Sequence, residues 1–264
     1  MMKFTVVTPS FNQARYLERT IESVLSQRGD FELEYLVVDG GSSDGSVDIL
    51  RRYQGRLWWV SEPDRGQSHA INKGLARATG SVLAWLNSDD TYELGALDRV
   101  ARTFRDTGAR WCFGECRIVD EQDREIRRAI RWYKRRLGRQ YSLGRLLTKD
   151  LVPQPATFFR RDLFLEAGAV DEAYHLAMDY DLWLRFARIA EPAFIPEALA
   201  TFRWHDTSKS GGRYTDAAWE AYGIARRHAL SGERAALRRH YLHVLSLVAV
   251  YRALDLLPRS RRSA

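Results

Sequence analysis

The sequence predicts an α/β protein in which a mostly parallel sheet is flanked by helices and followed by a C-terminal helical extension. The first observation is an alternation of short apolar, β-branched runs with segments whose apolar residues recur at helical spacing, as Leu17, Ile21 and Val24 do. The second is that each expected strand of the first half ends in polar or turn-forming residues. Strands that alternate with helices in this way build parallel sheets through right-handed crossovers.

The expected elements of the first half follow one another regularly. We expect strands at residues 4–8, 33–38, 57–60 and 81–86. We expect helices at residues 12–27, 46–53, 66–78 and 95–107. The fourth strand, SVLAWL, carries almost no polar residue, which is typical of a strand that is buried on both faces.

The second half of the chain is less regular. We expect a strand at 111–119, a basic and aromatic segment of helix and loop at 124–147, helices at 162–167 and 177–190, a strand pair at 192–202 and a polar loop at 206–212. Residues 217–257 read as helical with a break near Ser231 and Gly232. Because no repeat or linker is evident, we expect one compact domain over residues 1–215 and a basic amphipathic helical extension over 216–264.

The composition is that of a folded protein. Of the 264 residues, 45% are hydrophobic and 28% are charged, which excludes disordered and low-complexity chains. Two cysteines, Cys112 and Cys116, exclude a disulfide scaffold, and without a second pair they do not predict a structural zinc site. Residues 1–10 lack the apolar core of a signal peptide, and no run of about 20 apolar residues is present, so we expect a cytoplasmic protein.

The net charge of +7 is unevenly placed. Residues 124–139 and 226–264 each carry a net charge of +7, so the rest of the chain is acidic. Two interpretations of these segments are open. In the first, they bind an acidic partner, such as nucleic acid, anionic lipid or a diphosphate-bearing substrate. In the second, they form solvated helix faces.

Four expected strands end in residues that suit a ligand site. The ends are Pro9-Ser10, Asp39-Gly40-Gly41, Ser61-Glu62-Pro63-Asp64 and Asn87-Ser88-Asp89-Asp90. Because ligands of such sheets bind beyond the carboxyl ends of the strands, these residues predict a site for a charged ligand together with a divalent cation. Neither the P-loop pattern nor the Gly-x-Gly-x-x-Gly fingerprint is present, which excludes two common nucleotide-binding motifs.

The chain contains four ordered motifs: Thr8-Pro9-Ser10-Phe11-Asn12, Val37-Val38-Asp39-Gly40-Gly41-Ser42-Ser43-Asp44-Gly45, Asn87-Ser88-Asp89-Asp90 and Met178-Asp179-Tyr180-Asp181-Leu182-Trp183. Together they resemble the inverting glycosyltransferases of family 2, which have the GT-A fold, a Rossmann-like α/β architecture. The resemblance runs from about residue 3 to about residue 210. It implies a donor half over about 1–110 and an acceptor half over about 111–215.

The resemblance implies which residues hold a sugar-nucleotide donor. Asp39 would accept a hydrogen bond from the base, and the backbone around Pro9 would contact the base. Asn87 would bind the ribose, and Arg65 would reach the base or a phosphate. The structural alternatives are that Asp39 only stabilises the turn that follows it and that Arg65 is a solvated loop charge.

The resemblance also implies a Mn²⁺ or Mg²⁺ cofactor on the diphosphate. The family carries its metal on an Asp-x-Asp segment, and here Asn87 replaces the first acid while Asp89 keeps the position of the usual ligand. His205, at the end of the last expected strand, is a second candidate metal ligand. The alternatives are a helix N-cap cluster for residues 87–90 and a structural histidine.

The resemblance implies that Asp179 is the general base. In the family, the last carboxylate of a Glu-Asp pair removes the proton from the acceptor hydroxyl; here Met178 replaces the first acid. Asp181 points to another helix face. The structural alternative for Asp179 is a first-turn acid that the helix dipole favours. Trp183 is expected in the core, residues 154–157 on the acceptor side, and residues 206–212 as a lid over the donor.

The resemblance implies a metal-dependent, inverting glycosyltransferase. It would move a sugar, UDP-linked in our reading, to a hydroxyl of a saccharide or lipid-linked saccharide in bacterial surface-polysaccharide biosynthesis, without a nucleic-acid partner. The rivals are a nucleotidyltransferase, although residues 9–14 contain no Gly or Lys, and a non-catalytic module that binds membrane or nucleic acid. Residues 238–262 suit either peripheral membrane contact or packing on the domain or in a homodimer.

Overall fold

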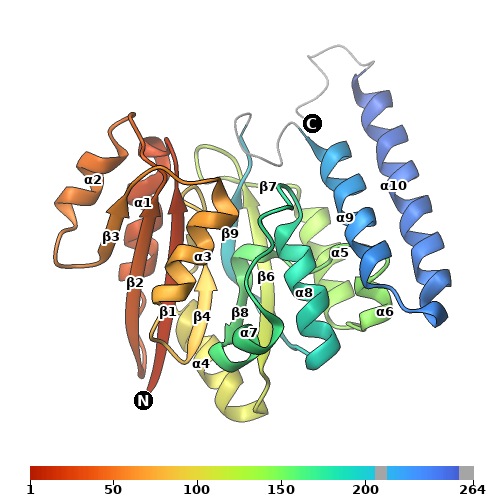
Figure 1. Ribbon diagram of the computed structural model, residues 1–264, viewed down its shortest axis with the longest axis horizontal. Coiled ribbons are helices and arrows are strands. Elements are labelled where there is room, and N and C mark those ends of the chain that lie inside the picture. Colours follow the sequence, from red (N-terminus) through yellow and green to blue (C-terminus); the bar gives the residue numbers. More distant parts are fainter. Residues whose placement is uncertain (206–212, 256–264) are drawn as a thin grey trace.

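The computed structural model describes residues 1–205 and 213–255, and these residues form a nine-stranded sheet flanked by helices (Figure 1). The strands are β1 (Met2–Ser10), β2 (Phe31–Asp39), β3 (Trp58–Ser61), β4 (Val82–Trp85), β5 (Thr91–Tyr92), β6 (Trp111–Val119), β7 (Glu125–Ile126), β8 (Thr157–Arg160) and β9 (Ala193–Arg203). The strand order is β3-β2-β1-β4-β8-β6-β9-β5, and β7 pairs with β6.

Helices cover both faces of this sheet. They are α1 (Ala14–Leu25), α2 (Ser46–Arg52), α3 (Gln67–Arg77), α4 (Ala96–Thr107), α5 (Arg128–Gly138), α6 (Leu143–Leu146), α7 (Arg161–Ala167), α8 (Met178–Ile189), α9 (Tyr214–His228) and α10 (Arg234–Asp255), with short 3₁₀ turns η1 (Gln154–Ala156) and η2 (Ser231–Glu233). The α/β class, the first-half alternation and the helical break near residue 231 are therefore confirmed.

The parallel part of the sheet is its N-terminal half. Strands β3, β2, β1 and β4 run parallel, and the register pairs Ser10 with Asp39 and Asp39 with Ser61. Beyond β4 the sheet is mixed, because β8 is antiparallel to both β4 and β6 while β6 and β9 are parallel. The register brings the polar ends of β1, β2 and β3 to one edge, as the sequence predicts.

The expected strand pair at 192–202 is wrong. Residues Ala193–Arg203 form the single strand β9, and the sequence pattern breaks because of a bulge. Gly114 pairs with Ile195 but Glu115 pairs with Ala198, so two residues of β9, including Pro196, lie outside the regular ladder. A proline has no N–H to donate, and a bulge is where a strand tolerates it.

The core consists of one apolar cluster on each face of the sheet. On one face, the rings of Trp85 and Trp111 each stack on Trp183, at centroid distances of 5.4 and 6.0 Å. Trp183 is completely buried and is therefore a core residue, as expected. Because Trp183 lies one turn into α8, this packing fixes the start of the helix and with it the position of Asp179.

The C-terminal helices lie at the end of the sheet furthest from β3 (Figure 1). Ala221, Ile224 and Ala225 of α9 are buried in the same core cluster as Trp183, and Val244 of α10 is completely buried. The extension therefore packs on the α/β unit through one face. No helix among residues 1–205 and 213–255 is long and apolar enough to cross a membrane.

Candidate active site

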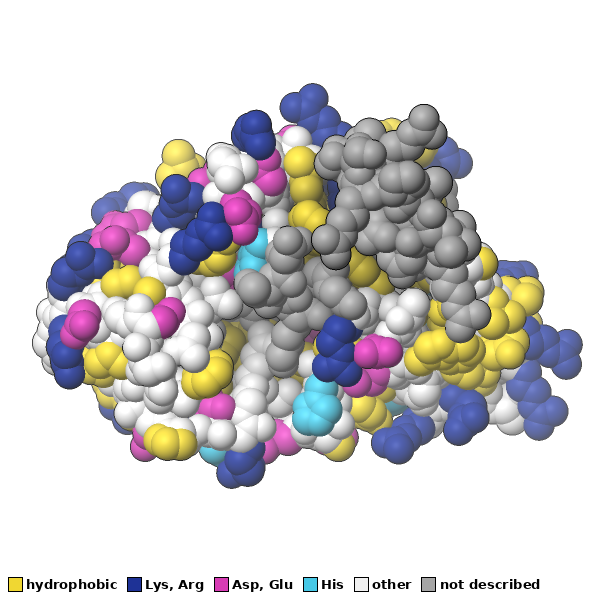
Figure 2. Space-filling model, turned by 90° about the horizontal axis from the view of Figure 1, so that it is seen from above, with side chains coloured by type: hydrophobic (Ala, Val, Ile, Leu, Met, Phe, Trp, Pro, Cys, Tyr) yellow, Lys and Arg dark blue, Asp and Glu magenta, His cyan; other side chains and the backbone are white. Residues whose placement is uncertain are grey.

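A cavity of about 860 Å³ lies at the carboxyl ends of the parallel strands. That face of the molecule points toward the viewer in Figure 2. Four of the predicted site residues line the cavity: Pro9 after β1, Asn87 and Asp89 after β4, and Asp179 at the start of α8. Residues separated by up to 170 positions in the chain therefore line one cavity; the strand ends predicted that Pro9, Asn87 and Asp89 would meet, and the family resemblance added Asp179.

Asp39 does not line this cavity, although the next residue, Gly40, does. Its side chain is completely buried and accepts hydrogen bonds from the Gly41 and Ser42 amides and from the Ser42 and Ser61 hydroxyls, at 2.6–3.1 Å. These contacts hold the loop after β2 against the end of β3. The structure thus gives Asp39 the turn-stabilising role that the sequence offered as an alternative, and its contact with a base stays a prediction.

Arg65 is engaged by another side chain. Its guanidinium makes a bidentate ion pair with Glu172, with the shortest N–O distance at 2.8 Å, and it does not line the cavity. The partner lies 107 residues further along the chain. Donor binding by Arg65, which also stays a prediction, would require this ion pair to open.

Asn87 organises the end of β4 through its amide. Its Oδ1 accepts a hydrogen bond from Gln67 at 2.7 Å, and its Nδ2 donates to Gln154 at 3.1 Å and to Asp90 at 3.3 Å. Gln154 in turn donates to the carbonyl of Trp85. An aspartate at this position could not donate these two bonds, so the asparagine fits its surroundings.

Asp89 and His205 form the pair that suits a metal ion. The His205 ring, which is almost completely buried, lies with Nε2 3.0 Å from Oδ2 of Asp89 and packs on the ring of Tyr16 at 4.9 Å. The Asp89 carboxylate is 15% exposed and lines the cavity. A carboxylate and an imidazole are ligands that Mn²⁺ accepts.

These two side chains fit a metal that a diphosphate also binds. Among residues 1–205 and 213–255, no group of three or more His, Cys, Asp or Glu side chains is arranged to hold a metal ion. An ion held by one or two protein side chains and completed by phosphate oxygens is the usual arrangement for Mg²⁺ in phosphate chemistry. The pair is therefore adequate for a metal ion that arrives with the donor diphosphate.

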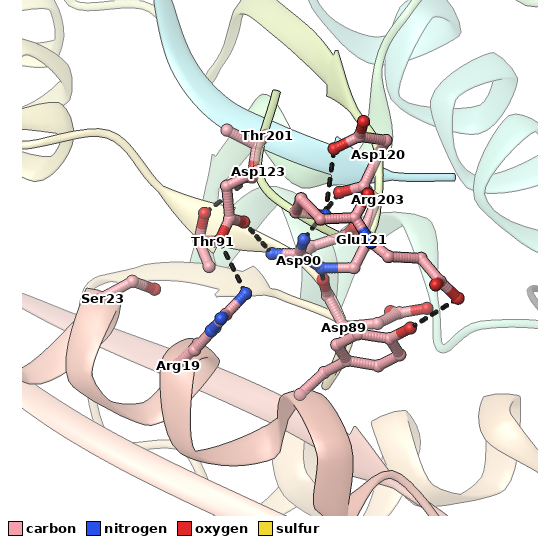
Figure 3. A network of polar contacts seen from close by, with 12 residues as sticks. Arg19, Ser23, Asp89, Asp90, Thr91, Asp120, Glu121, Asp123, Thr201 and Arg203 are labelled. Atoms are coloured by element: carbon pink, nitrogen blue, oxygen red, sulfur yellow. Dashed lines mark hydrogen bonds and ion pairs between the residues drawn. The ribbon is translucent and has the colours of Figure 1, made fainter. Parts of the chain in front are cut away.

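Arg203 fixes the backbone that carries Asp89 (Figure 3). This completely buried arginine donates to the carbonyls of Asp89 and Asp120, its amide donates to Asp90, and it forms an ion pair with Asp123. Burial, followed by the nearby charge of Asp89, raises the pKa of Asp90 well above its usual value. Arg203 and Asp90 thus join the end of β9 to the end of β4.

The cavity also contains a pair of carboxylates, Asp179 and Asp150, whose pKa values are both raised. Asp179 and Asp150 both line it, together with Lys134 of α5. Burial, and then the charge of Asp150, raise the pKa of Asp179 to about 7, and the Tyr180 amide and Lys134 offset part of this effect. Burial also raises the pKa of Asp150. A carboxylate with a pKa near neutrality is suited to accept a proton from a substrate.

Asp181, in contrast to Asp179, is a structural carboxylate. It lies on the same helix but accepts hydrogen bonds from Arg185 at 2.9 Å and from His228 at 2.7 Å. Burial alone would raise its pKa, but the His228 hydrogen bond and the charge of Arg185 outweigh burial and hold the pKa below its usual value. Asp181 therefore ties α8 to α9, whereas Asp179 faces the cavity.

Sequence reasoning gave no individual role to two residues that line this cavity, Ser10 and Asp150. Ser10 is 3% exposed, lines the cavity and has no hydrogen-bond partner among the described residues for its hydroxyl. Buried hydroxyls normally have partners, so this one is available to a ligand. Only the position of Ser10 at a strand end signalled it. Asp150 lies in a segment without a recognisable pattern. The lid expected at 206–212 lies outside the described residues.

Comparison with known proteins agrees with this geometry. The family model described as Glycosyl transferase family 2 matches residues 5–167. The chain belongs to this family. A protein of Mycobacterium tuberculosis named as an uncharacterized glycosyltransferase is 35% identical over 206 residues, which cover 75% of this chain and 74% of the relative. A PGL/p-HBAD biosynthesis glycosyltransferase of Mycobacterium bovis is 33% identical over 188 residues, 69% of this chain and 68% of the relative.

Solved structures show the same fold. The S. aureus protein TarS, residues 1–349 with UDP-GlcNAc, matches with a TM-score of 0.66 at 17% identity, over 91% of this chain and 72% of that one. The mannosyltransferase PcManGT of Pyrobaculum calidifontis, with GDP-Man and Mn²⁺, matches with a TM-score of 0.68 at 18% identity, over 98% of this chain and 81% of that one. The chain is thus a GT-A-fold glycosyltransferase, and the rival readings as a nucleotidyltransferase or a non-catalytic module are excluded.

Proposed function

We propose that this glycosyltransferase moves a sugar from a UDP-linked donor to a hydroxyl of a saccharide or lipid-linked saccharide, with inversion and with Mn²⁺ or Mg²⁺ on the diphosphate. The observation that carries the proposal is the cavity of about 860 Å³ at the strand ends. Its lining contains Asp89, which is paired with the buried His205, and Asp179, whose pKa is raised to about 7. Asp89 and His205 suit a metal ion on the leaving diphosphate, and Asp179 suits the incoming hydroxyl.

Asp179 acts as the general base. Its carboxylate accepts the proton of the acceptor hydroxyl while the hydroxyl oxygen bonds to the anomeric carbon, and the bond from that carbon to the diphosphate oxygen breaks. Because the two oxygens lie on opposite sides of the carbon, the configuration inverts. Burial supports this role, since the carboxylate that takes the proton becomes neutral in a poorly solvated place.

The donor half of the cavity supports binding of a nucleoside diphosphate. Pro9 and Ser10 present rigid backbone and a hydroxyl that has no partner among the described residues, and Asn87 presents an amide that is held in place by Gln67, Gln154 and Asp90. Asp89 and His205 would hold the metal ion, which would neutralise the charge that develops on the leaving diphosphate. Neighbours with the same fold were solved with UDP-GlcNAc and with GDP-Man and Mn²⁺, which supports a nucleotide-sugar donor.

A saccharide acceptor is supported by the apolar part of the lining. Ile118, Ile130 and Phe202 contribute to the cavity wall and could pack on the apolar face of a sugar ring. A relative named for PGL/p-HBAD biosynthesis supports an acceptor that belongs to a glycolipid or a related glycoconjugate.

Ligand-induced thermal stabilisation tests the donor and metal assignment. UDP with Mn²⁺ should raise the melting temperature of the wild type, because a ligand that binds only the folded state stabilises it. Asp89→Asn should lose the Mn²⁺-dependent part of this shift. The matched control is Asp48→Asn, at an exposed acid on α2 that forms an ion pair with Arg51, and it should keep the full shift.

Two outcomes of this experiment would contradict the assignment. If GDP stabilises the protein and UDP does not, the nucleotide is wrong. If Asp89→Asn keeps the Mn²⁺-dependent shift, the metal does not bind at Asp89.

A further inference from the structure

A groove of about 530 Å³ lies between α6 and α10, and it shares no lining residue with the active-site cavity. Its wall contains four basic or titratable side chains and two hydroxyls, but no acid. These are Arg145, Lys149, Arg239, His243, Ser142 and Thr148. Cations bind a phosphate, and a hydroxyl beside them adds a hydrogen bond. The Ser142 hydroxyl accepts from the Arg145 amide and keeps its own hydrogen to donate, whereas the Thr148 hydroxyl already donates to the Arg145 carbonyl.

The cations of this groove are not neutralised within the described part of the chain. Arg145 donates to the amide oxygen of Gln140 and Lys149 to the hydroxyl of Tyr133, both at 2.5 Å, and neither these two nor Arg239 forms an ion pair with a described acid. Burial, followed by the charge of Lys149, lowers the pKa of His243. The groove therefore holds uncompensated positive charge, which an anion would relieve.

An apolar surface borders this groove on the outer side of α9 and α10. Leu242, Leu245, Tyr241 and Trp219 are each between 41% and 63% exposed. On the opposite side of α10, Val244 is completely buried, so the helix has one packed face and one open apolar face. Figure 2 shows hydrophobic side chains gathered at this end of the molecule, with Lys and Arg side chains along the edge of the patch.

We propose that the groove between α6 and α10 binds the phosphate of an anionic lipid while the open apolar face of α9 and α10 inserts into the interfacial layer of a membrane. Basic side chains beside exposed Leu, Tyr and Trp are the composition of a helix that lies in such an interface. Charge complementarity favours this occupant over a second copy of the chain, because a symmetric dimer would bring two basic grooves together.

The position of the groove connects it with catalysis. The segment from Ser142 to Lys149 lines the groove, and the next residue, Asp150, lines the active-site cavity. Tyr180, beside Asp179, donates a hydrogen bond to the carbonyl of Leu146 in the same segment. A membrane bound at the groove would thus lie beside the carboxylate pair, where a lipid-borne acceptor must arrive. This consequence rests on the proposed function; lipid binding itself does not.

Flotation of the full-length chain with vesicles tests the proposal. The wild type should bind vesicles of phosphatidylcholine with phosphatidylglycerol, should bind vesicles of phosphatidylcholine alone much more weakly, and should dissociate at high salt. Arg145→Gln with Arg239→Gln should weaken binding by about 30-fold, since each basic residue near an anionic surface contributes about fivefold. Leu242→Ser with Leu245→Ser should also weaken it.

The matched control is Arg51→Gln with Arg52→Gln on α2, at the other end of the molecule, which changes the net charge equally and should leave binding unchanged (Figure 1). Melting temperatures establish that each variant is folded. Asp179→Asn should bind vesicles like the wild type, so failure of the proposed chemistry and failure of lipid binding are separate results.

Three results would overturn the proposal. One is equal vesicle binding by the groove variant and the α2 control. Another is stabilisation of the wild type by inorganic phosphate or pyrophosphate, dependent on Arg145 and Arg239, without vesicle binding, which would make the groove a site for a soluble anion. The third is a dimer that Leu242→Ser with Leu245→Ser dissociates, again without vesicle binding, which would assign the apolar face to a second copy.

Discussion

Replacing Asp179 by asparagine should stabilise the folded protein while it abolishes function. The pKa of Asp179 is raised to about 7 by burial and by Asp150, against the ordinary value of 3.8. Between these two pH values the folded state keeps a proton that the unfolded chain has already released. The free energy of unfolding therefore falls as pH rises through this window, and above it the folded wild type carries the charge of a partly buried carboxylate.

The size of the effect follows from the same values. A difference of about three pKa units corresponds to at most about 4 kcal/mol, because one unit is 1.36 kcal/mol. Asp179 is only partly buried, and asparagine loses part of the hydrogen bonding, so we expect a net gain of about 1–2 kcal/mol at pH 8. This is a rise of about 3–6 °C in melting temperature for a chain of this size.

Asp181→Asn is the matched comparison on the same helix. The pKa of Asp181 lies below its usual value because the bonds from His228 and Arg185 outweigh burial, so its stabilising effect is present above pH 4 and is lost as pH falls. Removing its charge leaves Arg185 half-paired and should cost about 3 kcal/mol at pH 8.

Thermal unfolding of the two variants and the wild type at pH 5 and pH 8 measures both effects. The gain of Asp179→Asn should be larger at pH 8 than at pH 5, whereas Asp181→Asn should show nearly the same loss at both values, because both lie above the range in which Asp181 titrates. A lower melting temperature for Asp179→Asn at pH 8 would refute the reasoning, since it would mean that the Asp179 carboxylate is favourably solvated or paired.

Three further predictions concern the site and its support. Asp150→Asn should lower the pKa of Asp179 and move the acidic limb of the kcat/KM profile down by about one pH unit, because one neighbouring negative charge is gone. An unchanged limb would show that the charge of Asp150 does not act on Asp179. Ser10→Ala should weaken UDP binding about fivefold without lowering the melting temperature, because the hydroxyl has no partner among the described residues to lose; calorimetric titration measures it. Trp183→Ala should cost about 3–5 kcal/mol in chemical denaturation, because it removes the ring on which Trp85 stacks; a loss below 1 kcal/mol would contradict this view of the core.

Long periodic elements could be predicted from the sequence because their signal is local. Strand β6 has the expected bounds, 111–119, and α4 and α8 begin and end within one residue of the expected ranges. Strands β5 and β7 contain two residues each, too few for any periodicity, and exist only because β9 and β6 pair with them. Tertiary pairing of this kind leaves no pattern in the sequence.

The candidate site divides in the same way. Asn87 and Asp89 were predicted because strand ends converge in parallel sheets, a rule that depends only on topology, whereas Asp179 was predicted only from the resemblance to the family. Arg65 differs because its ion pair with Glu172 joins residues 107 positions apart, and no local pattern predicts such a partner. The pair of Asp150 with Asp179 is likewise a product of the fold.

Release of UDP from a UDP-sugar tests the central claim most directly. With Mn²⁺ and an acceptor present, the wild type should release UDP, and Asp179→Asn should do so at least about 100-fold more slowly while it still shows the UDP–Mn²⁺ thermal shift. Asp181→Asn, assayed below its melting temperature, should keep most of the rate. If Asp179→Asn releases UDP at the wild-type rate, Asp179 is not the base, and the proposed reaction at this cavity is contradicted.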